Sequence, residues 1–177
     1  MTTRPRLYLA GPEVFLPDPA AAAAALKALC TRHGLEGVFP QDAALVPGPE
    51  ESRLAFAARI RQANLDLIRG TDGVIANVSP FRGPSSDDGT AYEMGFATAL
   101  GHPVFAYASD LRPLLQRTQS RLPLAHDGRD WRDAEGMAVE EFDLPVNLML
   151  VDPAIGPVHP TPEAAIQAAA AWFAARR

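Results

Sequence analysis

Hydrophobic and polar positions along this chain fall into short apolar runs separated by longer amphipathic stretches. The apolar runs are rich in aliphatic and aromatic residues and are only four to six residues long. That length and composition predict the buried strands of a parallel sheet. The five predicted strands span residues 6–10, 37–40, 73–78, 103–107 and 146–150.

Helical periodicity occupies the stretches between these runs. A proline follows Asp18 directly, which predicts an N-cap and a first helical residue, and Gly34 and Gly70 predict helix ends. In the second helix, apolar residues recur at helical spacing and predict a buried face made of Phe56, Ile60, Ala63, Leu67 and Ile68. The predicted helices span residues 18–33, 52–70, 89–101 and 162–177.

Strands that alternate with helices predict a parallel sheet covered by helices on both faces. We therefore expect an α/β fold, a doubly wound, flavodoxin-like sheet of five parallel strands, in a single domain of residues 1–177. Residues 109–143 show no clear period and predict an irregular excursion. Ligands of such folds bind beyond the carboxyl ends of the strands, so the loops after Ala10 and Asn77 and the loop before Glu93 should share one edge.

The composition excludes several classes of protein. The chain has 177 residues, a net charge of −5 and a pI of about 5.3, so it lacks the basic character of a nucleic-acid-binding protein. No apolar run reaches the roughly 18 residues of a membrane span. The single cysteine, Cys30, excludes an internal disulfide and is expected as a buried residue of a helix. We expect a cytoplasmic protein with no nucleic-acid or membrane partner.

Several motifs for cofactors and nucleophiles are absent from the sequence. It contains no Gly-x-Gly-x-x-Gly, no Walker-type Gly-Lys-Ser/Thr and no Gly-x-Ser-x-Gly. The histidines are scattered and lack metal-ligand spacing; they are His33, His102, His126 and His159. We therefore expect neither a metal nor a cofactor, and carboxylates remain as the candidate catalytic groups.

Glu93 is the only charged residue in the segment 90–100, which is otherwise apolar or small on every face. A helix that is apolar all round is normally buried, and a buried carboxylate is costly unless it is paired or used. The Asp-Asp-Gly sequence at 87–89 is typical of a helix start. It predicts that Glu93 lies in the first turn, where the helix dipole favours the ionised form. A carboxylate held in this way suits nucleophilic attack.

The residues around Glu93 suggest a division of roles. Asp88 is expected to cap the helix, while Asp87 and Glu93 face a cleft. Tyr8 lies late in an aliphatic strand, so it is either a core residue or a hydroxyl placed against the Glu93 carboxylate to orient it. The same acids also fit a plain helix start, where acidic residues are enriched.

Several segments together resemble the nucleoside 2-deoxyribosyltransferase family over nearly the whole chain. They are residues 7–12 with Phe15, 64–77, 77–83, 87–95 and 144–150. The most specific combination is the acid-Gly-Thr-Ala-aromatic-Glu-x-Gly run with the later Asn-Leu-Met. The resemblance implies exchange of 2-deoxyribose between nucleobases, with a 2′-deoxynucleoside and a free nucleobase as ligands. Likeness to the kinetoplastid and bacterial branch leans toward purines.

The resemblance also implies a role for each matching residue. Glu93 would attack C1′ of the nucleoside and form a deoxyribosyl ester, Tyr8 would hydrogen-bond Glu93, and Asp87 would bind sugar hydroxyl groups. Asn147, with the backbone of Met149, would reach into a neighbouring subunit's site and hold the 5′-hydroxyl, so a homo-oligomer is expected. A second base would then attack the ester, and two inversions give net retention.

The base side of the site leaves alternatives open. Phe15 and Phe81 are either apolar walls that stack on the base or core residues. In the lactobacillal branch, an aspartate that acts as acid toward the leaving base occupies the position of Asn64, whose amide supplies no titrating proton. Either Asn64 holds the base and water protonates it, or Asp42 or Asp72 is the acid; Asp42 is the better candidate because it is expected at the cleft edge.

Three other functions are also compatible with the sequence. A hydrolase would act on 2′-deoxynucleosides or on their 5′-monophosphates. The monophosphates require phosphate-binding groups, for which the candidates are Ser79, Arg82, Ser85 and Ser86. Asp87 near the 5′ end would repel a phosphate dianion and so favours an unphosphorylated nucleoside. A nucleotide-binding module would bind without turnover, and an interaction domain would use residues 109–143 as its contact surface.

Overall fold

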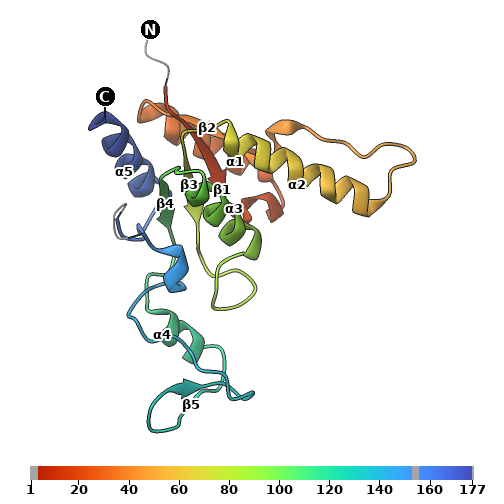
Figure 1. The fold of residues 1–177 in the computed structure, drawn as a ribbon. Coiled ribbons are helices and arrows are strands. Elements are labelled where there is room, and N and C mark those ends of the chain that lie inside the picture. The colour runs from red at the N-terminus through yellow and green to blue at the C-terminus, as the bar shows by residue number, and fades with distance from the viewer. Residues whose placement is uncertain (1–3, 153–155, 177) are drawn as a thin grey trace.

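The centre of the molecule is a parallel sheet of four strands (Figure 1). The computed structural model describes residues 4–152 and 156–176. The strands are β1 (Arg6–Ala10), β2 (Glu36–Val38), β3 (Gly73–Asn77) and β4 (Val104–Tyr107), in the order β2-β1-β3-β4. Because β1 pairs with both β2 and β3, the winding reverses between β1 and β3. Such a switch point is where ligands bind in open α/β sheets.

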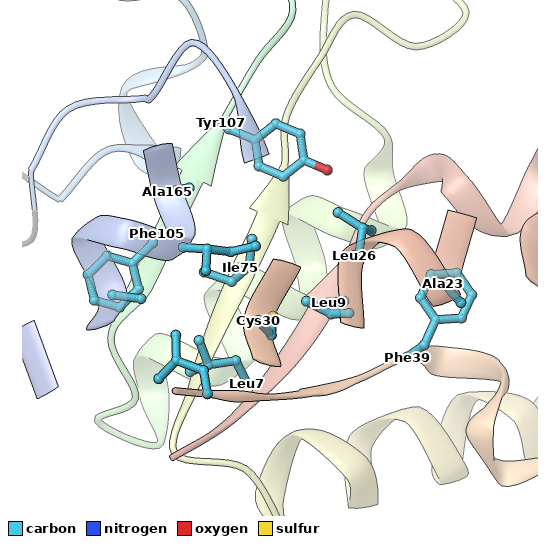
Figure 2. Packing of buried hydrophobic residues seen from close by; sticks show 13 residues of the cluster. Leu7, Leu9, Ala23, Leu26, Cys30, Phe39, Ile75, Phe105, Tyr107 and Ala165 are labelled. Carbon is cyan, nitrogen blue, oxygen red and sulfur yellow. The ribbon is translucent and has the colours of Figure 1, made fainter. Parts of the chain in front are cut away.

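Side chains alternate between the two faces of the sheet, and helices cover both faces. Leu7 and Leu9 of β1 pack toward α1 (Pro19–Arg32) and α5 (Pro162–Ala174), in the cluster that Figure 2 shows. Cys30 of α1 is fully buried in this cluster, as expected.

The opposite face of the sheet packs against the other two long helices. Tyr8 and Ala10 point toward α2 (Arg53–Arg69) and α3 (Asp88–Ala99), with Ile68 of α2 in the same cluster. The expected α/β architecture, a parallel sheet between two layers of helices, is therefore confirmed.

Helix boundaries follow local signals in the sequence. Asp18 Oδ1 accepts a hydrogen bond from the Ala21 N–H at 2.9 Å, so the predicted cap of α1 is present. Gly34, just beyond α1, has a φ of 75°, a conformation that favours glycine. The last predicted helix begins at Pro162 as expected, and Arg177, its predicted end, lies outside the described residues.

The prediction of a fifth strand at residues 146–150 is wrong, because the chain forms a 3-10 helix, η3 (Leu148–Leu150), in this segment. The reason lies in Asn147, whose Oδ1 accepts a hydrogen bond from the Met149 N–H at 3.0 Å and turns the backbone. Beyond β4, the described residues add an isolated parallel bridge between Tyr107 and His159. The parallel sheet therefore has four strands rather than five.

Residues 109–143 leave the sheet and extend away from it (Figure 1). They contain the short helix α4 (Leu114–Gln119) and an antiparallel pair of two-residue strands, β5 (Ala125–His126) and β6 (Trp131–Arg132). The Leu114 N–H donates to the Leu144 carbonyl at 2.8 Å, which joins the start of α4 to the chain that returns toward the sheet.

Two predictions about buried helix faces are wrong in part. The first half of α2 projects beyond the sheet (Figure 1), so Ile68 is fully buried whereas Ile60 is 40% exposed. On α3, Tyr92 is 51% exposed, so this apolar helix is not buried on every face in the single chain. None of the helices in the described ranges is both long and apolar enough to cross a bilayer.

Candidate active site

A cavity of about 750 Å³ opens beside the turn that follows β1. Its walls come from the 3-10 helices η1 (Pro12–Phe15) and η2 (Pro40–Ala43), the loop after η2, and helices α2 and α3. The polar side chains among its lining residues are Gln41, Asn64, Asp87 and Glu93. A volume of this size lies within the range of about 300–1,000 Å³ that is typical of small-molecule sites.

Glu93 lines this cavity and is hydrogen-bonded to Tyr8. The Tyr8 hydroxyl donates to Glu93 Oε1 at 2.7 Å, so the contact suggested by the sequence is present. Tyr8 is completely buried, which fixes the position of its hydroxyl. Within the described part of the chain, no hydrogen bond reaches Glu93 Oε2. One carboxylate oxygen is therefore held and the other is available to a ligand.

The start of α3 differs from the expectation. Asp87, not Asp88, is the N-cap: its Oδ2 accepts from the Thr90 N–H at 2.9 Å and from the Thr90 hydroxyl at 3.1 Å. Asp87 thus caps the helix and lines the cavity at once. Glu93 lies in the second turn rather than the first, where the effect of the helix dipole has largely faded.

Burial has the largest effect on the pKa of Glu93. Burial raises the pKa of Glu93 from 4.5 to about 7, against the lowering effect of the Tyr8 hydrogen bond and with a smaller contribution from the charge of Asp87. Burial and the neighbouring Glu93 charge raise the pKa of the Tyr8 hydroxyl far above its ordinary value, so Tyr8 remains a donor. A carboxyl group that titrates near neutral pH is characteristic of catalytic sites.

Asn64 and Glu93 also line a second, smaller cavity of about 370 Å³ between α2 and α3. Arg61 lies in its wall, and the Arg61 guanidinium donates to the Tyr92 hydroxyl at 2.7 Å. Glu93 can therefore be approached from two sides, one of which is flanked by a cation.

Phe15 and Phe81 form a stacked pair, but only Phe15 lines the cavity. Their ring centroids lie 5.4 Å apart with 19° between the planes, and Phe15 is 58% exposed. The Arg82 guanidinium lies over both rings, and Arg82 has a φ of 54°, which is uncommon for a residue other than glycine. Phe15 is thus an apolar wall of the cavity that Phe81 and Arg82 support.

The two aspartates considered as acids toward the leaving base have other partners. Asp42 Oδ1 accepts from the Lys27 ammonium at 2.5 Å, and its Oδ2 accepts from the Phe39 N–H at 2.9 Å. Asp72 precedes β3, at the amino end of the sheet, and accepts from the Arg6 N–H at 2.7 Å. Neither aspartate lines the cavity, which leaves Asn64 as the candidate that does.

Asn147 and Met149 lie outside both cavities of their own chain. The Asn147 amide donates to the Glu140 carboxylate, which also accepts from the Leu148 N–H at 3.2 Å. Met149 is 81% exposed at the tip of η3. The tip is therefore organised by its own hydrogen bonds and presents its side chains to the surface.

Several lining residues were missed from the sequence. Phe56 and Ile60 of α2 line the cavity together with Leu45 and Val46. The helical spacing of Phe56 and Ile60 was visible, but it was interpreted as a core-facing stripe. Gln41 was also missed, although it follows β2 at the functional edge of the sheet.

The arrangement suits covalent catalysis at an electrophilic carbon. It combines an oriented carboxylate, a phenolic hydrogen-bond donor and a partly apolar cavity. Within residues 4–152 and 156–176, no group of three or more His, Cys, Asp or Glu side chains is placed to hold a metal ion.

Comparison with known proteins identifies the family and the fold of this chain. The sequence model of the nucleoside 2-deoxyribosyltransferase family matches residues 7–149. A 2-deoxyribosyltransferase from Leishmania mexicana has a similar structure, with a TM-score of 0.74 and 34% identity over 98% of this chain and 99% of that chain. A 2-deoxyribosyltransferase from Bacillus psychrosaccharolyticus shares the fold, with a TM-score of 0.50 and 19% identity over 88% of this chain and 98% of that one.

The chain is also similar in sequence to one curated protein of unstated function. An uncharacterized protein of Schizosaccharomyces pombe is 35% identical over 119 residues, which are 66% of this chain and 56% of that protein. The family match covers most of the chain and includes both Tyr8 and Glu93. The chain belongs to the nucleoside 2-deoxyribosyltransferase family.

Proposed function

We propose that this protein transfers the 2-deoxyribosyl group of a 2′-deoxynucleoside from one nucleobase to another through a covalent ester on Glu93. The observation that carries the proposal is the hydrogen bond of 2.7 Å from Tyr8 to Glu93 beside a cavity of about 750 Å³. Membership of the nucleoside 2-deoxyribosyltransferase family supports it.

The proposed chemistry is a double displacement at C1′. The free oxygen of Glu93 forms a bond to C1′ while the bond from C1′ to the base nitrogen breaks, and its electron pair leaves with the base. The departing base takes up a proton. A nitrogen of the second base then attacks C1′ and gives up its proton to water, and the ester bond breaks to return the carboxylate. The carboxylate also stabilises the positive charge that develops on the sugar in each step.

Sugar and base are held by different groups in this proposal. Asp87 Oδ1 accepts no hydrogen bond from the described residues and binds a sugar hydroxyl group. The Asn64 amide hydrogen-bonds the base, which is protonated through water because an amide has no titrating proton. Phe15 stacks on the base, with Phe81 behind it. The likeness of residues 80–83 to the kinetoplastid branch leads us to include a preference for purines.

A neighbouring subunit completes the proposed site. Asn147 and the Met149 backbone hold the 5′-hydroxyl of a nucleoside bound next to the Glu93 of another chain. Two observations support a homo-oligomer: the tip of η3 is exposed, and Tyr92 of α3 is half exposed.

A base-exchange assay tests the proposal. The protein is incubated with deoxyinosine and free adenine, without metal or cofactor, and the expected product is deoxyadenosine. A panel of purine and pyrimidine bases then measures base preference. Release of free deoxyribose without deoxyadenosine would instead indicate a hydrolase, and binding without any product would indicate a non-catalytic module.

The matched variants are Glu93→Ala and Glu93→Gln. Both should abolish exchange while circular dichroism shows an unchanged fold. Incubation of the native protein with a fluorinated deoxynucleoside should add the mass of the sugar to the peptide that contains Glu93. Full exchange by Glu93→Ala, or a sugar adduct on another residue, would overturn the mechanism.

A further inference from the structure

A second pair of a buried tyrosine and a glutamate lies at the same edge of the sheet. Glu13 of η1 accepts on Oε1 from the Tyr107 hydroxyl at 2.8 Å and from the Asn77 amide at 2.6 Å. Tyr107 ends β4, as Figure 2 shows, and Asn77 ends β3. Burial and the charge of Glu13 raise the pKa of Tyr107 far above its ordinary value, so its hydroxyl stays a donor. One carboxylate therefore joins the turn after β1 to the ends of β3 and β4.

The turn after β1 packs tightly against this carboxylate. A Cβ atom at Gly11 would lie 2.0 Å from Glu13 Oε2 and 2.9 Å from the Asn77 Cβ. No side chain fits there, so glycine is required for the close approach. Gly11 lines the main cavity whereas Glu13 does not. The Glu13 carboxylate thus supports the cavity wall from behind.

The same hydrogen bonds extend to the loop that carries Phe81. Asn77 Oδ1 accepts from the Ser79 N–H at 3.0 Å, so the residue that holds Glu13 also shapes the start of this loop. Phe15 follows Glu13 by two residues within η1. The stacked rings of Phe15 and Phe81 therefore come from two loops that are both anchored at Glu13.

We infer that Glu13 is a positioning residue that holds the loops after β1 and β3 together, so that Phe15 forms the wall on which the nucleobase stacks. The inference rests on the proposed base exchange. Glu13 affects base binding rather than attack at C1′, because the contact between Tyr8 and Glu93 does not involve it. Its role depends on the acceptor oxygen that it offers to Tyr107 and Asn77, and not on its charge.

The test measures KM and kcat for the acceptor base in Glu13 variants. Glu13→Ala should raise KM about tenfold through the loss of two buried hydrogen bonds, with kcat within about twofold of the native value. Glu13→Gln keeps an acceptor oxygen and should restore most of the affinity. Because Glu13 acts through Phe15, adding Glu13→Ala to Phe15→Ala should change KM by less than about twofold.

Tyr107→Phe provides a milder variant should Glu13→Ala fail to fold. It removes one of the two hydrogen bonds and should raise KM by less than Glu13→Ala, at unchanged kcat. Glu141→Ala is the control for loss of a surface acid. An unchanged KM in Glu13→Ala and Tyr107→Phe, additive effects of Glu13→Ala and Phe15→Ala, or a Glu13→Gln variant as impaired as Glu13→Ala would overturn the inference. These outcomes differ from failure of the proposed function, in which the native protein itself would show no base exchange.

Discussion

Two opposing requirements, ionisation and burial, act on Glu93. It must be ionised to attack C1′, yet burial favours its protonated form and brings its pKa to about 7. The hydrogen bond from Tyr8 stabilises the anion and offsets part of this cost. A base-exchange rate that depends on the anion should therefore fall as the pH drops through about 7.

Tyr8→Phe should move the acidic limb of the pH–rate profile, where the rate falls as the pH drops, to higher pH. The Tyr8 hydrogen bond lowers the pKa of Glu93, so its loss raises that pKa and leaves less anion at neutral pH. A shift of one pH unit slows exchange about tenfold on the acidic limb and little at high pH. The measurement is kcat/KM for both proteins between about pH 5 and 9. Coincident acidic limbs would show that a group other than Glu93 titrates.

The raised pKa of Glu93 also makes a prediction about stability. Between pH 4.5 and about 7, the folded chain binds more protons at Glu93 than the unfolded chain, so this contribution to stability falls as the pH rises. Above that window the ionised carboxylate costs on the order of 1–3 kcal/mol, which Glu93→Gln removes. In urea unfolding, the variant should exceed the native protein in stability at about pH 8 and differ little at about pH 4. An equal difference at both pH values would contradict the shift.

Some of these residues could be predicted from the sequence and others could not. Glu93 and Tyr8 stand out because each breaks the pattern of its own element, as a charge in an apolar helix and a hydroxyl in an aliphatic strand. The raised pKa of Glu93 was not predicted, because the sequence pattern placed Glu93 in the first turn, where the helix dipole would favour the anion. Glu13 went unnoticed because its partners Asn77 and Tyr107 are 64 and 94 residues away along the chain.

Among the elements, those defined by local pattern were predicted well. The strands β1, β3 and β4 match their apolar runs to within one residue at either end. The errors arose where one pattern has two meanings. The stripe on α2 faces the core in one half and a cavity in the other, and the apolar run at 146–150 contains Asn147, whose local hydrogen bond replaces a strand with η3.

Asp87 acts on the α3 element in two ways, as its cap and as a charge near Glu93. Asp87→Asn keeps an oxygen that can accept from the Thr90 N–H but removes the charge that raises the pKa of Glu93. The acidic limb of the pH–rate profile of Asp87→Asn should therefore move to lower pH, and its free energy of unfolding should change little. Asp87→Ala should shift the limb likewise but also lose about 1 kcal/mol of unfolding free energy, because the cap is gone. Thermal unfolding and pH profiles of both variants measure this, and equal stability of the two would contradict the capping role.

In the whole molecule, large apolar side chains remain exposed on the elements that project from or flank the sheet. They include Leu54, Tyr92, Met137, Phe142 and Met149. In the proposed homo-oligomer, a second chain would cover some of these side chains. The tip that carries Asn147 contributes to neither cavity of its own chain, so its proposed role requires a second subunit.

A mixing experiment tests that requirement in the assembled protein. Glu93→Gln and Asn147→Ala should each lose exchange alone, but a two-fold dimer of one chain of each retains one site with both native residues. Random assembly of equal amounts gives mixed dimers in about half of cases, each with one of two sites intact, so about a quarter of the native activity should return. Exchange is measured after the two variants are unfolded and refolded together. The control pair, Glu93→Gln with Glu93→Ala, leaves no chain with a native Glu93, so it should show no recovery. If the first pair also fails to recover, Asn147 does not serve a neighbouring site.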